Sequence, residues 1–313
     1  MYTRDHLGLI VDNYNRRVSL FDTNTLEVEQ QLPIDADILD VAVNRECTRA
    51  FVSSFSSRTM FQIDLCSTPA QVIGSAVSTT FLEDVALTPD GKFVLSVDGS
   101  ASNQDIVSYS VYQNAIVSSL PANAQAVAIS PITRQLILTA EYSGNSVHRF
   151  IIRRDGSLED TGQSFAVGDG PINIIFSPNG EFAFVAANNA NNINVLSTLI
   201  PENVALVSSA LTSSNPQSMA ITRDGRHVFV LTSTNVDIYA FDPVAGSLTF
   251  LRSFAHGLSI SSYYGVDQIA LDNSETRLFI SGQGQVSAFT TYGMLLGNVQ
   301  GASGPGGIAI CRC

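Results

Sequence analysis

Short apolar segments recur along the chain, and each is followed by a turn and a second apolar segment. The first segments of successive copies begin 44, 42, 47, 45, 50 and 39 residues apart. Four antiparallel strands and their turns need about 40 to 50 residues, so each copy predicts one blade of a β-propeller. The seven first segments comprise residues 41–43, 85–87, 127–129, 174–176, 219–221, 269–271 and 308–310.

The turns between these segments are typical of β-hairpins. Residues 88–91 read Thr-Pro-Asp-Gly, residues 177–180 read Ser-Pro-Asn-Gly, and residues 223–225 read Arg-Asp-Gly. Pro, Asn or Asp, and Gly stand where a tight turn needs them. Gly, Asn and Asp also interrupt the apolar runs every 8 to 12 residues or so, which is about the spacing of short strands and disfavours helical repeats.

The two ends of the chain complete each other. The seventh inner segment has almost no chain after it, whereas residues 7–40 supply outer strands that lack an inner one. Joining them closes the ring and leaves no long sheet edge exposed. We therefore predict an all-β, single-domain, seven-bladed β-propeller in which the C-terminal strand joins the N-terminal blade. The predicted blades comprise residues 308–313 plus 1–40, 41–84, 85–126, 127–173, 174–218, 219–268 and 269–307.

Composition narrows the classes of partner and compartment. The 28 acidic residues outnumber the 16 basic ones, giving a formal charge of -12, which disfavours nucleic acids and anionic membranes as partners. No apolar run approaches the length of a membrane span, about 18 residues, and residues 1–12 lack the pattern of a signal peptide. We expect a cytoplasmic protein if the sequence is complete, and a secreted or periplasmic one if a leader has been removed. The four cysteines lack metal-binding spacing and are expected to be free thiols.

Several segments carry a resemblance to a known family. Residues 141–150 read Glu-Tyr-Ser-Gly-Asn-Ser-Val-His-Arg-Phe and are followed by Arg-Asp-Gly-Ser-Leu at 154–158. Residues 238–243 and 246–248 repeat this pattern. The chain resembles the lactonase-like seven-bladed propellers, which include bacterial phosphogluconolactonases, fungal muconate cycloisomerases and the related YVTN repeats. The resemblance extends over essentially the whole chain and implies a propeller fold with a ligand site at one mouth of the central channel.

The same resemblance implies that the usual catalytic residues are lost. Active family members carry Arg and His where this chain has Ile172 and Asn173, and Glu where it has Asn188. Arg would hold a carboxylate or a developing oxyanion, and His and Glu would transfer protons. Neither an isoleucine nor a neutral amide can do this chemistry.

The residue before each inner strand is expected to lie at the channel mouth, and five of these seven positions are polar. Alanines 42, 86, 128, 220, 270 and 309, within the inner strands, are expected to face the axis. The polar side chains predict a funnel that hydrogen-bonds a polyol or a lactone, or holds Ca²⁺ between Asp40 and Asp84. The alternative is a mouth filled only by water. The predicted ligand-binding residues here are Asp40, Asp84, Asn173, Ser218 and Gln268.

Loops on the same face add further candidates. Glu141 is the one candidate for a general base, and Asn188 occupies the equivalent place in the next blade. Tyr142 and Tyr264 are candidate ligand contacts, and Tyr264 belongs to the long insertion 254–267, where it either covers the funnel or packs the loop. His148, on a predicted strand, is expected to be structural.

Two hypotheses on function follow. In the first, a lactonase-like propeller binds a small polar molecule (a lactone, a sugar acid or a polyol) at the channel mouth; whether it is an enzyme is left open, and no cofactor other than Ca²⁺ is considered. In the second, the propeller is a non-enzymatic scaffold that binds another protein.

Overall fold

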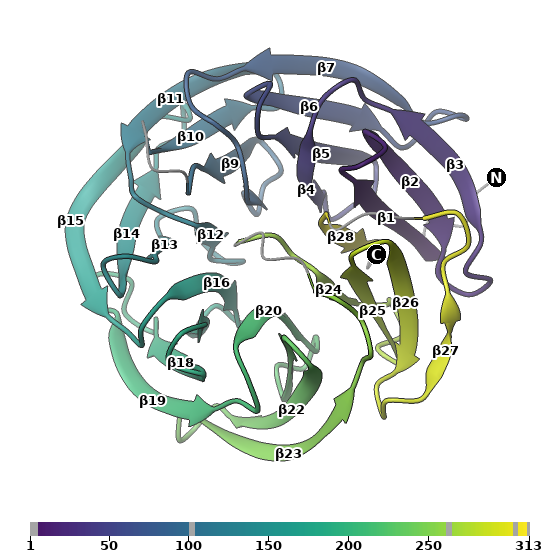
Figure 1. Ribbon diagram of the computed structural model, residues 1–313. Helices are drawn as coiled ribbons and strands as arrows, with labels where there is room; N and C mark the ends of the chain where they lie inside the picture. Colours follow the sequence, from purple (N-terminus) through teal and green to yellow (C-terminus); the bar gives the residue numbers. More distant parts are fainter. Residues whose placement is uncertain (1–5, 100–103, 261–264, 303–305, 312–313) are drawn as a thin grey trace.

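The fold is a ring of seven four-stranded antiparallel sheets around a central axis (Figure 1). A computed structural model describes residues 6–99, 104–260, 265–302 and 306–311. The prediction of an all-β, seven-bladed propeller is confirmed. Within these residues, no helix is long and apolar enough to cross a membrane.

The first four blades are consecutive along the chain except for one strand. Blade 1 contains β28 (Ile308–Ile310), β1 (Leu7–Asp12), β2 (Arg17–Asp22) and β3 (Val28–Pro33). Blade 2 contains β4 (Ile38–Val43), β5 (Arg49–Ser54), β6 (Thr59–Asp64) and β7 (Gln71–Val77). Blade 3 contains β8 (Val85–Leu87), β9 (Phe93–Val97), β10 (Asp105–Ser110) and β11 (Ala115–Pro121). Blade 4 contains β12 (Ala126–Ile129), β13 (Ile137–Glu141), β14 (Ser146–Ile152) and β15 (Leu158–Ala166).

The last three blades repeat the same meander from the axis outward. Blade 5 contains β16 (Pro171–Phe176), β17 (Phe182–Ala187), β18 (Asn192–Ser197) and β19 (Ala205–Leu211). Blade 6 contains β20 (Pro216–Ile221), β21 (His227–Thr232), β22 (Asn235–Asp242) and β23 (Ser247–Ala255). Blade 7 contains β24 (Ile269–Leu271), β25 (Arg277–Gly282), β26 (Gln285–Thr290) and β27 (Leu295–Asn298).

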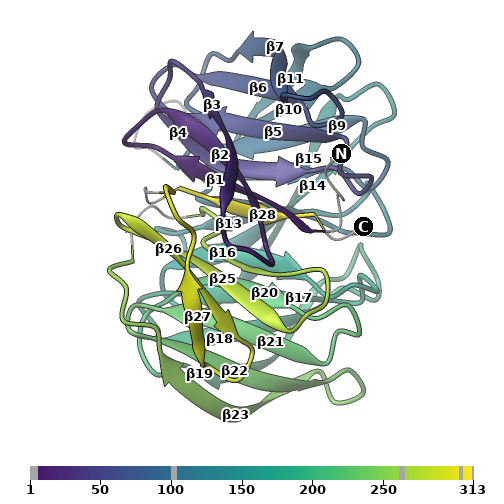
Figure 2. The same cartoon turned by 90° about the vertical axis from the view of Figure 1, so that its right-hand side faces the viewer.

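The ring closes within blade 1, where the last strand of the chain pairs with the first. β28 is the innermost strand of this blade and runs antiparallel to β1, with Gly8 opposite Ile310 and Ile10 opposite Ile308. Figure 2 shows the yellow β28 beside the purple β1. The predicted closure by the C-terminal strand is therefore observed.

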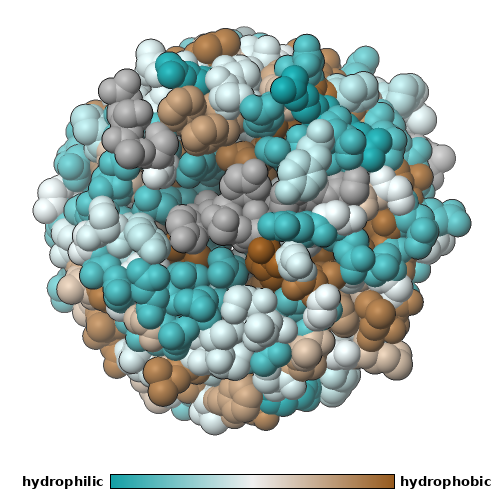
Figure 3. Space-filling model, viewed as in Figure 1, coloured by the Kyte–Doolittle hydropathy of each residue, from teal (hydrophilic) through white to brown (hydrophobic). Residues whose placement is uncertain are grey.

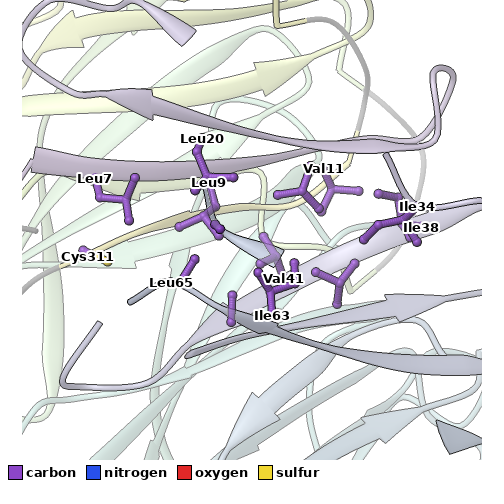
Figure 4. Packing of buried hydrophobic residues seen from close by; sticks show 14 of the residues in the cluster. Leu7, Leu9, Val11, Leu20, Ile34, Ile38, Val41, Ile63, Leu65 and Cys311 are labelled. Carbon is purple, nitrogen blue, oxygen red and sulfur yellow. The ribbon is translucent and has the colours of Figure 1, made fainter. Parts of the chain in front are cut away.

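The hydrophobic core lies between neighbouring blades. Second and third strands are buried on both faces, as in β17, where all six residues are buried, whereas outer strands such as β19 are largely exposed. Figure 4 shows one such layer between blades 1 and 2, in which Leu9 and Val11 of β1 face Val41 of β4 and Ile63 of β6. Burying each such side chain contributes about 1.5 to 3 kcal/mol, so the stability of each blade depends on its neighbours.

Gly8 leaves space for an aromatic ring at the closing blade. A Cβ at this position would lie 2.2 Å from the ring of Phe21 and 2.9 Å from Ile310. Phe21 packs on Phe279 of blade 7, with 5.3 Å between ring centroids. We predict that Gly8→Ala lowers the free energy of unfolding by about 3 kcal/mol, because the buried ring has no free space to move into. Denaturant titration measures this loss.

Gly162→Ala is the matched control. Its φ is 69° and nothing lies within 4 Å of the added Cβ, so only the cost of a positive φ, about 1 to 2 kcal/mol, is expected. Equal losses in the two variants would contradict a steric role for Gly8.

Candidate functional site

Three of the polar side chains predicted at the channel mouth join neighbouring blades. Asp40 Oδ2 accepts a hydrogen bond from the backbone N–H of Val85, the first residue of β8, at 3.2 Å. Asp84 Oδ2 accepts one from Val127 of β12 at 2.6 Å. The innermost strand of a blade has no further strand on its axial side, so such N–H groups need an acceptor from elsewhere. Each aspartate supplies it to the next blade around the ring.

Ser218 and Gln268 form the third link of this kind, since Ser218 Oγ accepts from the Gln268 N–H at 3.2 Å. Asn173 of β16 instead donates from Nδ2 to Oδ1 of Asp267, in the segment that leads to β24, at 3.2 Å. All five predicted mouth residues are at most 4% exposed. The structure therefore brings them together as a buried layer and does not leave them lining an open funnel.

The buried layer contains a group of carboxyls. Asp40 and Asp84 lie within hydrogen-bonding contact of each other, and Asp267 is close enough for its charge to act on both. Burial, together with the charge of Asp267, raises the pKa of Asp40 to about 8. Burial and the neighbouring Asp40 raise the pKa of Asp84 well above its usual range, and burial raises that of Asp267 to about 6. At neutral pH the group therefore holds protons rather than three negative charges.

The insertion before blade 7 covers this layer. Gly265 lies against blades 3 and 4, because a Cβ there would be 1.9 Å from the carbonyl oxygen of Gln125 and 3.2 Å from Cβ of Asp84. The chain then returns across the mouth to β24, as Figure 1 shows. Its Asp267 carbonyl accepts from the N–H of Ile308 at 2.7 Å. Tyr264, predicted to contact a ligand, lies outside the described residues.

The loop candidates have separate environments. Asn188 is buried and donates from Nδ2 to the carbonyl of Pro216 at 2.9 Å, so it also links blades. Tyr142 is partly exposed, and its hydroxyl hydrogen-bonds the side chain of Asn189, with contacts of 3.1 and 3.2 Å. Neither side chain contributes to the buried carboxyl layer through a described hydrogen bond.

Glu141 has a histidine partner. Its Oε2 lies 2.8 Å from Nε2 of His148 and 3.0 Å from Oγ of Ser146, and its Oε1 accepts from Asn123 Nδ2 at 3.0 Å. Glu141 ends β13 and pairs with Ser146, so His148 lies diagonally across the hairpin on the same face. Both side chains remain accessible, at 22% for Glu141 and 35% for His148.

The neighbours of His148 determine which of its two ring nitrogens carries the hydrogen. An ionised carboxylate only accepts hydrogen bonds, so Nε2 is assigned as the N–H nitrogen and Nδ1 as the basic one. Nδ1 has no hydrogen-bond partner among the described residues. Ser146 Oγ also lies 3.0 Å from Nε2, the same nitrogen that Glu141 uses, so the three residues are not a Ser-His-Glu relay. They form an oriented Glu-His pair with one available base.

This pair opens into a groove of about 600 Å³ between blades 3 and 4. None of the described residues that line it is Lys or Arg, and two further carboxylates, Asp105 and Asp160, belong to its walls. The lining residues are Gln104, Asp105, Pro121, Ala122, Asn123, Thr139, Glu141, His148, Phe150 and Asp160.

Across the described residues, no three or more His, Cys, Asp or Glu side chains are arranged to hold an ion. Asp40 and Asp84, the predicted Ca²⁺ ligands, each give one oxygen to a backbone N–H group.

The sequence pointed to Glu141, but the contact between Glu141 and His148 was not predicted. The signal was available: a four-residue turn, 142–145, between two strands places residues 141 and 146 opposite each other, and residue 148 then shares the face of 146.

The raised pKa values of the buried aspartates predict how stability varies with pH. A folded-state pKa above the unfolded value stabilises the protein at low pH, and this contribution is lost as pH rises from about 4 towards 8. Asp40→Asn keeps an acceptor for Val85 but cannot ionise. We expect its melting temperature to exceed that of the wild type at pH 8, with a smaller advantage at pH 5.

Asp35→Asn provides the control, since the side chain of Asp35 is fully exposed. Its melting curve across pH 4 to 9, followed by circular dichroism, is expected to run parallel to that of the wild type. A parallel curve for Asp40→Asn as well would rule out a buried ionising carboxyl at this position.

Comparison with known proteins finds one clear relative and finds the same fold in lactonase-like propellers. No protein-family model and no curated protein matches it. A functionally unknown protein from Desulfotomaculum acetoxidans is 38% identical, with a TM-score of 0.95 over 98% of this chain and 99% of that one. The periplasmic gluconolactonase of Pseudomonas aeruginosa shares the fold at 15% identity, with a TM-score of 0.78 over 97% and 98% of the chains.

A candidate 6-phosphogluconolactonase from Bacteroides fragilis is similar to the same degree, at 14% identity and a TM-score of 0.78, with 99% of both chains covered. Identities this low establish a common fold, which agrees with the resemblance found in the sequence. The 38% identity over nearly the full length establishes closer kinship. The chain thus belongs to the family of the Desulfotomaculum acetoxidans protein and has the fold of the lactonase-like seven-bladed β-propellers.

Proposed function

We propose that the protein binds a small uncharged lactone in the groove between blades 3 and 4 and hydrolyses it, with His148 as general base. The observation that carries this proposal is the 2.8 Å contact between Glu141 and His148 at the wall of a groove of about 600 Å³. Pockets of this volume hold small molecules. The fold shared with a gluconolactonase supports a lactone as the substrate class.

The pair supplies the chemistry that ester hydrolysis needs. Nδ1 of His148 removes a proton from a water molecule as the water oxygen attacks the lactone carbonyl carbon. Glu141 holds the ring through Nε2 and stabilises the imidazolium that forms, as the aspartate does in serine proteases. The tetrahedral intermediate then collapses, the bond to the ring oxygen breaks, and the proton on Nδ1 passes to that oxygen. The product is the open hydroxy acid.

The charge of the groove limits the substrate. Glu141, Asp105 and Asp160 are carboxylic acids, and no described lining residue carries a fixed positive charge. A phosphate or carboxylate would be repelled here, whereas hydroxyl groups can donate to carboxylate oxygens. An uncharged hydroxylated lactone is therefore a better substrate than a phosphorylated lactone or a sugar acid.

The positions where the resemblance implies Arg, His and Glu give this proposal a second support. Ile172, Asn173 and Asn188 are all buried, and the Nδ2 groups of the two amides donate to Asp267 and to the Pro216 carbonyl. The reaction is therefore assigned to the groove between blades 3 and 4 and not to the channel mouth.

A direct test follows the release of acid from gluconolactone in a pH-stat, with spontaneous hydrolysis subtracted. We predict turnover by the wild type and a loss of about a hundredfold or more in kcat/KM for His148→Gln, because the amide has no basic nitrogen. Glu141→Gln is expected to lose less, since His148 keeps its base but not its orientation. 6-Phosphogluconolactone is expected to be a poorer substrate.

Asp40→Asn serves as the control, because Asp40 lies in the buried layer and not in the groove; its rate is expected to match that of the wild type. Absence of turnover with any uncharged lactone, or full activity in His148→Gln, would refute the proposal.

A protein-binding scaffold is the second candidate, and the exposed outer strands favour it. Leu206 of β19, Phe250 of β23 and Leu295 of β27 are 48%, 54% and 57% exposed. By contrast, the face shown in Figure 3 carries its apolar residues in small separate groups among hydrophilic ones. A protein partner would thus contact the outer rim of blades 5 to 7 rather than this face.

A further inference from the structure

The central channel contains a cavity that is separate from the groove between blades 3 and 4. Its volume is about 250 Å³; thirteen of its fourteen lining residues have apolar side chains, and polar atoms form nearly half of its accessible lining. Four of the alanines that the sequence predicts to face the axis, at positions 42, 220, 270 and 309, line it. The other lining residues are Val41, Val85, Ile175, Met219, Ile221, Asp267, Ile269, Leu271, Ile308 and Ile310.

Asp267 is the one ionisable residue among the described residues of this wall. It lies in the middle of the ring yet stays partly accessible, because the cavity reaches it. Asn173 donates to Asp267 through Nδ2 and is 2% exposed, and its Oδ1 has no hydrogen-bond partner. One end of the cavity therefore presents the carboxylate of Asp267.

The segment before β24 lies at the Asp267 end of the cavity, and a second hollow adjoins its other end. Gly265 and Asp267 cover the mouth through their contacts with Gln125 and Ile308. At the opposite ends of the inner strands, Ile310 also lines a second hollow of about 340 Å³, together with Val43 of β4 and other strand-end residues. A ligand that enters from that side passes the inner strands before it meets Asp267.

We propose that this cavity binds a small primary ammonium compound with an apolar body, with the ammonium donating to the carboxylate of Asp267. An ammonium supplies three donors and a positive charge, which the acidic end lacks. The apolar body removes the alanine and isoleucine walls from water. A neutral alcohol would leave the carboxylate without a counter-charge, and a carboxylate would be repelled by it.

The charges around Asp267 predict how binding depends on pH. Asp40 of β4 and Asp84 before β8 face it, Asn173 of β16 is neutral, and no ion pair joins these acids to a described basic residue. Asp267 has a pKa of about 6, so it is anionic at pH 7.5 and largely protonated at pH 5. Ammonium binding therefore weakens as pH falls through 6.

Isothermal titration of the whole protein with hexylamine, hexanol and hexanoate tests this site. We expect saturable one-to-one binding of hexylamine at pH 7.5, at least about tenfold weaker binding at pH 5, and no binding of the other two. Binding of hexanol as tight as that of hexylamine would overturn the proposal, and so would the absence of hexylamine binding.

Two variants locate the site. Asp267→Asn removes the charge and is expected to weaken binding at least tenfold, and Ala270→Leu fills the cavity and is expected to abolish it. The matched control is Asp237→Asn, which alters a buried aspartate outside the cavity and should bind as the wild type does. If Asp267→Asn fails to fold, the Ala270→Leu result decides, and unchanged binding in a folded variant of either kind would refute the assignment.

Discussion

The inner edges of the blades impose the constraint on which the rest of the structure depends. Each innermost strand turns one edge towards the axis, where no further strand can pair with it. Side chains of the preceding blade complete this edge: Asp40 accepts from blade 3, Asp84 from blade 4, and Ser218 from blade 7. Polar residues at the mouth are thereby used to hold the ring together, and they are buried in doing so.

The polar residues of the protein thus fall into two groups: those buried in hydrogen bonds that join the blades, and those that still face a groove or a cavity. The carboxyls of Asp40 and Asp84 accept from backbone N–H groups, whereas the Glu141-His148 pair faces a groove, and Asp267 faces the central channel. The three acidic settings differ in access to solvent and in their partners. Chemistry is expected where a charged group retains both accessibility and an unused atom.

The fold could be predicted from the sequence because its determinants are local. Turn residues and apolar runs repeat with a nearly constant spacing, and each copy builds one blade. The site could be predicted only in part. Gly265, which packs against Asp84, belongs to an insertion about 180 residues later in the chain. Whether His148 contacts Glu141 depends on the register of one hairpin. Such tertiary contacts leave no periodic signal.

The pairing of β1 with β28 also determines the order in which the blades can be completed during synthesis. Blades 2 to 7 can assemble while the chain is being made, but β1 lacks its inner neighbour until residues 308–310 leave the ribosome. Until then the edge of β1 is open to pairing with another chain, because its partner is the strand of the ring that lies furthest from it in sequence. Closure is therefore the last step in assembling the ring, and an incomplete ring carries an exposed strand edge that favours aggregation.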